Sequence, residues 1–394
     1  MVNGALDAVY LDYQATTPTD PRVVEAMRPY WSQFYGNPHS SDHSFGWQAD
    51  NAVEAARAEI AELIGADPRE IVFTSGATEA NNLAILGVAR ADSTTRRRII
   101  VSAIEHKCVL AAARAATVDG FEVTTVPVDQ SGFVNVKALA AAMDDRVALV
   151  SAMTVNNEIG TVQPIQEIGE LCKEFGAVFH TDAAQALTVL DIEVHNLPVD
   201  LMSLSAHKIY GPKGIGALYV SQNTPIRPKP IIHGGGQESG LRSGTLPTPL
   251  CVGFGEACRI IRQEDQEVRH KLSELRNHFL SGLLEIIPTL QINGAISARH
   301  PGNLNVRFPG VEADILLQRL QPSVAASTGS ACTSGQPEPS HVLSSIGLSQ
   351  RQAESSIRFS LGRFTTMSEL DYAIAKIRDA VYELHARTEA LENR

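Results

Sequence analysis

Cysteine is scarce in this sequence, and long apolar segments are missing from it. The 394 residues include five cysteines, which form neither a CxxC pair nor the paired framework of a small secreted protein. No apolar run approaches the roughly 18 residues of a membrane span. The N-terminal region also lacks a basic segment followed by an apolar one. We therefore expect a cytoplasmic protein that does not contact a membrane.

An excess of positive charge is missing as well. The chain has 44 Asp and Glu residues against 33 Lys and Arg, which gives a formal net charge of −11. This balance disfavours a chain-wide affinity for nucleic acid, so we expect no nucleic-acid partner. Hydrophobic residues make up 44% of the chain, and its length exceeds what one hydrophobic core usually supports. We expect two domains.

Between about residue 50 and residue 225, helical patterns alternate with short β-rich runs. The stretch DNAVEAARAEIAELIGA has apolar residues at helical spacing and stops at Gly65. The β-rich runs are EIVFTSG, RRIIVSA, FEVTTVPV, RVALVSAM, GAVFHTD and DLMSLSAHK. Such alternation is typical of an α/β fold, in which helices cover a mainly parallel sheet and ligands bind at the carboxyl ends of its strands.

The pattern changes from about residue 257. A long amphipathic helix is predicted over RIIRQEDQEVRHKLSELRNHFLSGLLEII, followed by short strands in NLNVRF and SSIRFSL and by a final helix from about residue 367. These elements are typical of an α+β domain. We predict a large domain over 17–256 and a small domain formed by 1–16 and 257–394.

One lysine has an unusual setting. In SLSAHKIYGPKGIGALYV, Lys208 directly follows a predicted buried strand and precedes a glycine-rich turn. Most lysines are solvated surface charges, but a lysine held at a buried strand end, after Ser205 and His207, loses its proton more readily and can form a Schiff base. If the partner carbonyl were pyridoxal phosphate, the site would need a carboxylate for the pyridinium nitrogen, an anion site and a group against the ring.

Two other strand ends offer the carboxylate and the anion site. Asp182 closes the run GAVFHTD, although it could instead cap a helix over AAQALTVL. In VFTSGATEANNLAI, a turn at Gly76 opens a helix whose first N–H groups, around Ala77 and Thr78, form an anion site. An ordinary capped helix is the alternative for this second segment.

Further polar residues follow two more strands. His106 comes after RRIIVSA, and a lone histidine in such a place is often structural. Asn156 and Asn157 follow RVALVSAM and are either turn residues or donors to a phenolate oxygen. Because the polar groups fall at successive strand ends, they support a single site at one edge of the sheet.

A set of motifs resembles a known family. The motifs follow one another along nearly the whole chain. In order, they are LDYQATTP, TSGATEANN, EHKCVL, VNNEIG, HTDAAQ, SAHKIYGPKGIGALYV, GGGQESGLRSGT, STGSACTSG and SIRFSLGRFTT. They are similar to those of the cysteine desulfurases of the iron–sulfur cluster and nitrogen-fixation type, in the aminotransferase class V branch of pyridoxal phosphate enzymes. The resemblance implies a type I fold with a mainly parallel seven-stranded sheet and a smaller α+β domain.

The resemblance also implies roles for individual residues. Lys208 would hold the cofactor through a Schiff base, Asp182 would pair with the pyridine nitrogen, and His106 would stack on the ring and assist proton transfer. Arg358 would clamp the substrate carboxylate, a task that suits its planar fork. The phosphate of the cofactor would contact Ala77, Thr78, Ser205 and His207, together with Thr245 from the partner subunit of a homodimer. Asn157 and Gln185 would lie beside the phenolic oxygen, and Asn157 would also face the substrate.

The family reaction converts L-cysteine to L-alanine and leaves a persulfide on an enzyme cysteine. That residue would be Cys332 in ASTGSACTSGQPEP, within a loop of about 323–340, because a thiolate is the nucleophile that attacks sulfur. The alternative is a bystander thiol in a surface loop. The resemblance implies an iron–sulfur scaffold protein or another sulfur acceptor as partner, and Cys332 is a possible ligand of a cluster shared with the scaffold.

Other readings of the sequence stay open. Within the same fold, the candidates are an aminotransferase, a selenocysteine lyase and a cysteine sulfinate desulfinase. An aminotransferase has no use for Cys332. A catalytically silent scaffold-binding module would not need Lys208, Asp182, His106 or Cys332.

Overall fold

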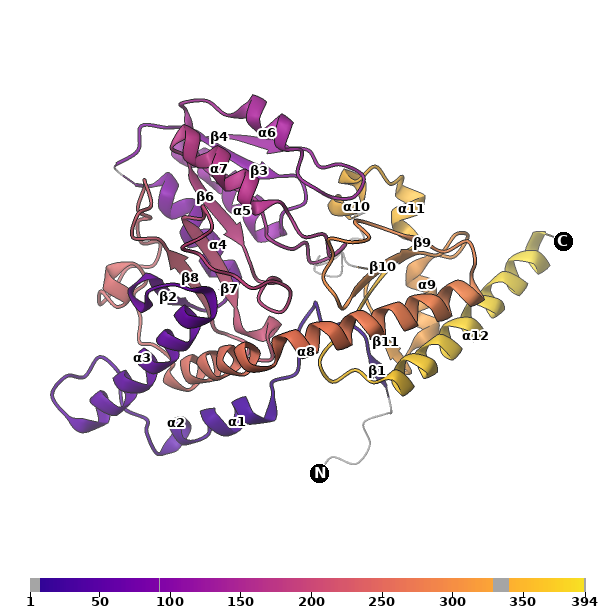
Figure 1. Cartoon of the computed structure of the whole chain (residues 1–394), viewed down its shortest axis with the longest axis horizontal. Coiled ribbons are helices and arrows are strands. Elements are labelled where there is room, and N and C mark those ends of the chain that lie inside the picture. The colour runs from indigo at the N-terminus through magenta and orange to yellow at the C-terminus, as the bar shows by residue number, and fades with distance from the viewer. Residues whose placement is uncertain (1–7, 92, 329–339, 393–394) are drawn as a thin grey trace.

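The computed structural model describes residues 8–91, 93–328 and 340–392. Figure 1 shows a larger body built round one central sheet and a smaller body that contains the C-terminal helix. The helix α8 (Thr248–Ile286) runs along both bodies. Among the described residues, no helix combines the length and apolarity that a membrane span requires.

The central sheet has seven strands and is mainly parallel, as expected. Its order is β2 (Ile71–Thr74), β8 (Gly216–Val220), β7 (Leu201–Ser205), β6 (Val178–Asp182), β5 (Val147–Ser151), β3 (Arg98–Ser102) and β4 (Glu122–Val126). Only β8 runs antiparallel to its neighbours in this sheet. Six of these strands lie in the predicted β-rich runs. The exception is β8, whose run GIGALYV follows the glycine-rich turn after Lys208.

Helices cover both faces of this sheet. On one face lie α4 (Ala77–Ala89) and α5 (Lys107–Ala115). The other face is packed against α3 (Ser44–Ile64), α6 (Val136–Ala142), α7 (Ile165–Phe175) and the first part of α8. The predicted helix that stops at Gly65 is confirmed, because Gly65 takes a left-handed backbone (φ 65°) that ends α3.

The helix α8 begins earlier than its amphipathic pattern indicated. No residue of its first turns, from 248 to 261, is fully exposed, and Cys251, Phe254 and Cys258 are buried in the large core. A helix without a fully exposed face gives a weak periodic signal, so the sequence pattern missed this part. Beyond Ile261 the same helix changes partners, and from Leu272 onward it packs into the core of the smaller body.

The smaller body contains the predicted α+β elements. An antiparallel sheet has the order β12 (Ser356–Ser360), β10 (Asn303–Arg307) and β9 (Gln291–Ile292), and β1 (Val9–Tyr10) pairs in parallel with β11 (Val324–Ala325). The final helix, α12 (Met367–Glu392), starts at the predicted residue and packs against α8. The remaining helices are α1 (Pro21–Met27), α2 (Pro29–Ser32), α9 (Ala313–Leu320), α10 (His341–Ser345) and α11 (Gln350–Glu354).

The topology brings the candidate residues to one edge. Strands β2, β3, β5, β6 and β7 all point the same way, so their carboxyl ends meet along that edge of the sheet. The turns that follow these strands carry the polar residues singled out in the sequence. On the far side of this edge stands β12 of the smaller body, which carries Arg358.

Candidate active site

A cavity of about 600 Å³ lies at the carboxyl edge of the sheet. Most of the predicted site residues line it, namely Ala77, Thr78, His106, Asn157, Asp182, Gln185, Ser205, His207, Lys208 and Arg358. Thr245 is exposed and is not among the lining residues. Cys332, the predicted sulfur acceptor, belongs to the segment 329–339, which lies outside the described residues.

Lys208 is held at the cavity by the N-terminal segment of the chain. Its Nζ donates hydrogen bonds to the carbonyl oxygens of Gln14, at 2.5 Å, and Ala15, at 2.8 Å. Thr17 donates from its backbone N–H and from its Oγ1 to the carbonyl of His207, both at 3.0 Å. Burial, aided by the nearby positive charges of Lys208 and Lys213, lowers the pKa of His207 to about 4. The histidine beside the lysine is therefore neutral near pH 7.

Asp182 presents a buried carboxylate at the end of β6. Its Oδ1 accepts from the backbone N–H of Ala184 at 3.0 Å, and its Oδ2 accepts from Nδ2 of Asn81 at 2.7 Å. The chain forms turns between β6 and β7 within the described residues, so the helix that Asp182 might have capped is not formed. A buried carboxylate that keeps a donor on each oxygen stays oriented toward the cavity.

The first turn of α4 opens on the cavity without a capping side chain. Its N-cap is Gly76, at a φ of 148° that favours glycine, and no described side chain caps the N–H groups of the first helical residues. A Cβ on Gly216 of β8 would lie 2.7 Å from the Cα of Gly76, so this close approach requires glycine in the strand. A side-chain cap is therefore not formed, and the N–H groups near Ala77 and Thr78 are available to an anion.

His106 is the N-cap of α5. Its Nδ1 accepts from the backbone N–H of Cys108 at 3.3 Å and lies 2.9 Å from Sγ of the same residue. Burial lowers the pKa of His106, although the negative charge of Asp182 opposes the shift. The imidazole is thus neutral, and its Nδ1 is an acceptor.

Arg358 reaches the cavity from β12. It is 4% exposed, and it donates from Nη1 to the carbonyl of Asn157 at 2.8 Å and from Nη2 to Oδ1 of Asp12 at 2.7 Å. Its Nε has no hydrogen-bond partner among the described residues. Asn156, by contrast, is a turn residue, because its Oδ1 accepts from the backbone N–H groups of Glu158 and Ile159.

The sequence reasoning missed several residues of the cavity. Asp12 and Gln14 belong to the motif LDYQATTP, but nothing in the sequence shows that they meet Arg358 and Lys208 across most of the chain. Cys108, which the sequence analysis did not assign to the site, also lines the cavity. Asn81 is buried behind it on α4 and bonds Asp182.

The residues present fit pyridoxal phosphate. A primary amine, a buried carboxylate, an uncapped helix N-terminus and a neutral imidazole surround one cavity. These are the groups that a pyridine nitrogen, a phosphate and an aldehyde carbon require. Within the described residues, no group of three or more His, Cys, Asp or Glu side chains is placed to hold a metal ion.

Comparisons with known proteins agree with this chemistry. Residues 9–373 match the family model "Aminotransferase class-V". The chain is 50% identical over 378 residues to "Cysteine desulfurase IscS" of Rickettsia rickettsii (strain Iowa), which covers 96% of this chain and 92% of the relative. It is 49% identical over 375 residues to "Cysteine desulfurase" of Homo sapiens, across 95% of this chain and 82% of that one.

Solved structures show the same fold. A "NIFS-LIKE PROTEIN" superposes with a TM-score of 0.88 at 36% identity, over 95% of this chain and 99% of that chain. The structure "SspA in complex with cysteine" has a TM-score of 0.78 at 39% identity, over 91% of this chain and 100% of that chain. With Lys208, Asp182 and His106 gathered at one cavity, the chain belongs to the class V aminotransferase family and, within it, to the pyridoxal phosphate-dependent cysteine desulfurases.

Proposed function

We propose that the enzyme moves sulfur from L-cysteine to Cys332 as a persulfide, releases L-alanine, and hands the sulfur to an iron–sulfur scaffold protein or another acceptor. The observation that carries the proposal is the meeting of Lys208 and Arg358 at one cavity. An amine-bearing lysine on the large body faces an arginine on the smaller body, so an amino acid between them has a partner at each end. The solved structure of SspA in complex with cysteine supports this substrate.

Each polar residue has a separate task in this proposal. Bound pyridoxal phosphate supplies an electron sink that makes the Cα–H of an amino acid acidic. Asp182 and the first turn of α4 hold the two ends of the cofactor, and Ser205, His207 and Gln185 line its surroundings. Arg358 binds the substrate carboxylate, with its unpartnered Nε as one donor. Lys208 Nζ takes the Cα proton.

The sulfur step balances without an external oxidant. The thiolate of Cys332 attacks the substrate sulfur, the substrate C–S bond breaks, and an S–S bond forms. The carbon that loses sulfur receives a proton, so cysteine and a thiol become alanine and a persulfide. A later acceptor or reductant takes the outer sulfur from Cys332.

The flanks of the segment 329–339 support this role for Cys332. On one side, Ser327 exchanges backbone hydrogen bonds with Arg358 at 2.7 and 3.2 Å. On the other side, Oγ of Ser340 donates to Oε2 of Glu158 at 2.8 Å. The flank at Ser327 therefore lies at the cavity beside Arg358, and the flank at Ser340 bonds the residue that follows Asn157, which also lines the cavity.

The described cysteines are poor candidates for the nucleophile. Burial raises the pKa of Cys108 to about 11 and that of Cys251 to about 12, and it raises the pKa of Cys172 and Cys258 as well. Thiols with raised pKa carry little thiolate at neutral pH. None of these four cysteines is in a disulfide, which supports our inference of a reducing compartment such as the cytoplasm.

A homodimer is part of the proposal. Trp31 and Trp47 are 63% and 55% exposed, and they share the N-terminal part of the large body with exposed Phe34, Tyr35 and Phe45. Exposed aromatic side chains are typical of protein interfaces. As the resemblance implies, Thr245, which is exposed, would reach the phosphate site of the partner in this dimer. Light scattering and tryptophan fluorescence of the purified protein test this assembly.

The decisive experiment incubates the loaded enzyme with L-cysteine and a reductant and quantifies sulfide and alanine together. Equal yields are expected. Cys332→Ser should keep the visible cofactor absorbance and lose sulfide release, whereas the control Thr333→Ala, which alters the same segment without removing a thiol, should retain turnover. Sulfide release by Cys332→Ser at the native rate would refute the role of Cys332, and alanine without sulfide would refute desulfuration. A cluster shared through Cys332 would appear only with a scaffold present.

A further inference from the structure

Cys108 lines the cavity and lies among several of its polar groups. It lies in the first turn of α5, and its Sγ is 2.9 Å from Nδ1 of His106 and 3.2 Å from Nδ2 of Asn81. The same Nδ2 donates to Oδ2 of Asp182 at 2.7 Å. The hydroxyl of Thr78, in the first turn of α4, is close enough to the thiol to lower its pKa. One thiol thus contacts or adjoins three of the residues assigned to the cofactor.

The direction of each hydrogen bond follows from the chemistry of the groups. The amide nitrogen of Asn81 can only donate, so Sγ of Cys108 accepts from it. Burial and the negative charge of Asp182 raise the pKa of Cys108 to about 11, so the thiol keeps its hydrogen at neutral pH. That hydrogen faces Nδ1 of His106, which also accepts the backbone N–H of Cys108 at 3.3 Å. With two donors on Nδ1, a neutral imidazole carries its proton on Nε2.

We propose that Cys108 is a positioning residue that keeps His106 neutral and in the Nε2–H form. The inference rests on the proposed role of His106 beside the cofactor ring and deepens it. A neutral ring adds no positive charge beside the lysine amine, and a proton held at Nε2 gives the cavity a donor at a defined atom. Asn81 orients the thiol by occupying the sulfur lone pair and by linking it to Asp182.

Other charges also act on His106, and they stay in place when Cys108 is replaced. Asp182 raises its pKa, while Lys208, His341 and Lys107 lower it. The charges of Glu105 and Asp182 raise the pKa of the thiol itself, and the Thr78 hydroxyl lowers it. A change at position 108 alone therefore isolates the hydrogen bond from the thiol to Nδ1.

The test compares Cys108→Ala, which removes the donor, with Cys108→Ser, which keeps an O–H in its place. The readout is NMR of ring-labelled histidine in the cofactor-free protein, with the His106 signal assigned by its loss in His106→Gln. Native protein and Cys108→Ser should show the Nε2–H form. Because a donor to the neutral ring disfavours protonation, Cys108→Ala should raise the pKa of His106 by about 0.5–1 unit. In the loaded enzyme, the acidic limb of kcat/KM should move by the same amount.

Several outcomes would overturn the inference. They are an Nδ1–H form in the native protein, an unchanged His106 pKa in Cys108→Ala, and an equal shift in Cys108→Ser. If Cys108→Ala does not fold, Cys108→Val removes the donor while filling the space, and the same shift is expected. The NMR result does not depend on the reaction catalysed. A failure of this inference is therefore distinct from a failure of the desulfuration assay.

Discussion

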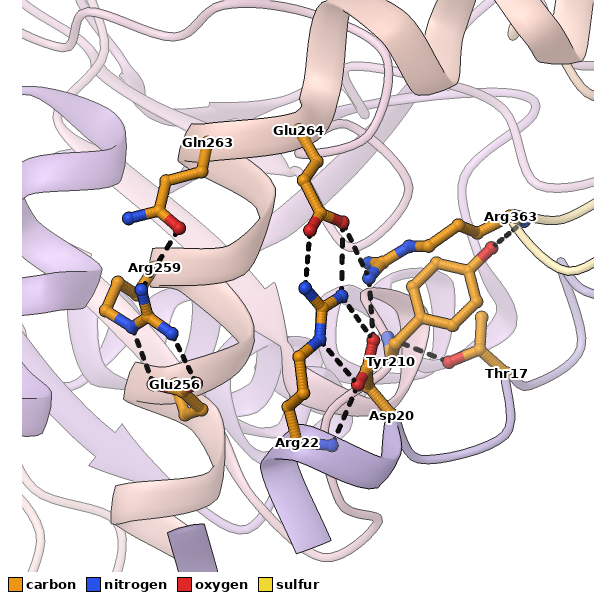
Figure 2. A network of polar contacts seen from close by, with 9 residues as sticks. All are labelled: Thr17, Asp20, Arg22, Tyr210, Glu256, Arg259, Gln263, Glu264 and Arg363. Carbon is orange, nitrogen blue, oxygen red and sulfur yellow. Dashed lines mark hydrogen bonds and ion pairs between the residues drawn. The ribbon is translucent and has the colours of Figure 1, made fainter. Parts of the chain in front are cut away.

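A buried ion pair next to the Lys208 turn joins the two bodies of the molecule (Figure 2). Arg363, in the loop between β12 and α12, donates from Nη1 to Oδ2 of Asp20 at 2.8 Å. Its guanidinium also lies over the ring of Tyr210, 4.2 Å from the centroid, and its backbone N–H donates to the Tyr210 hydroxyl at 2.5 Å. Tyr210 has a left-handed backbone (φ 65°), unusual for a side-chain-bearing residue, two positions after Lys208.

We predict that Arg363→Met destabilises the protein far more than Arg22→Met. Both arginines pair with Asp20, but the side chain of Arg363 is 10% exposed and that of Arg22 is 47% exposed. Removing one partner of a buried pair costs about 3–5 kcal/mol. Since Asp20 keeps Arg22 as a partner, we expect the lower end, about 3 kcal/mol, including about 1 kcal/mol from the lost cation–π contact. Because solvent screens the half-exposed guanidinium of Arg22, its pair with Asp20 should contribute about 1 kcal/mol or less.

The assay is urea unfolding of the cofactor-free protein, followed by circular dichroism. The expected result is a midpoint that falls at least twice as far for Arg363→Met as for Arg22→Met, with little change in slope. Added salt should reduce the effect of Arg22→Met more than that of Arg363→Met, because exposed charges are screened more. Equal losses in the two variants would refute the reasoning that burial sets the value of this network.

Two further predictions concern the cavity, and a third concerns the buried Glu158. Lys208→Ala should lose the cofactor absorbance of the native enzyme and form no borohydride-reducible bond; such a bond in this variant would refute the lysine assignment. Arg358→Lys should raise KM for L-cysteine about tenfold or more, because a lysine cannot supply the same paired donors; an unchanged KM would contradict that role. Burial raises the pKa of Glu158 to about 7, so the folded state binds a proton that the unfolded state releases near its ordinary pKa of 4.5. The stability from this group is therefore complete below about pH 4.5 and declines as pH rises toward 7. The unfolding midpoint of Glu158→Gln relative to the native protein should rise over this range, and a flat difference would refute the shift.

Much of the fold could be predicted from the sequence because burial produces recognisable patterns of apolar residues. The runs that became β3, β5, β6 and β7 are short, apolar and bounded, as strands covered on both faces must be. The first turns of α8 gave only a weak pattern, because none of their residues is fully exposed. The strand β8 was obscured by the glycine-rich turn before it.

The candidate site could likewise be predicted only in part from the sequence. Lys208, Asp182 and His106 could be predicted because each lies at or shortly after the end of a strand, and strand ends in a parallel sheet meet at one edge. The sequence could not predict that Asp12 pairs with Arg358 or that the Gln14 carbonyl accepts a hydrogen bond from Lys208. It also could not predict that Cys108 contacts His106.

The sequence by itself therefore determined the class of fold, the family and the residue types at the strand ends, since periodicity, turns and motifs are local properties of the chain. Only the tertiary structure decided the hydrogen-bond partners of those residues. It also decided which thiols keep their hydrogen, because burial and distance arise from segments that are far apart in sequence. The contact of the protonated Cys108 thiol with the histidine at the cavity is one such feature.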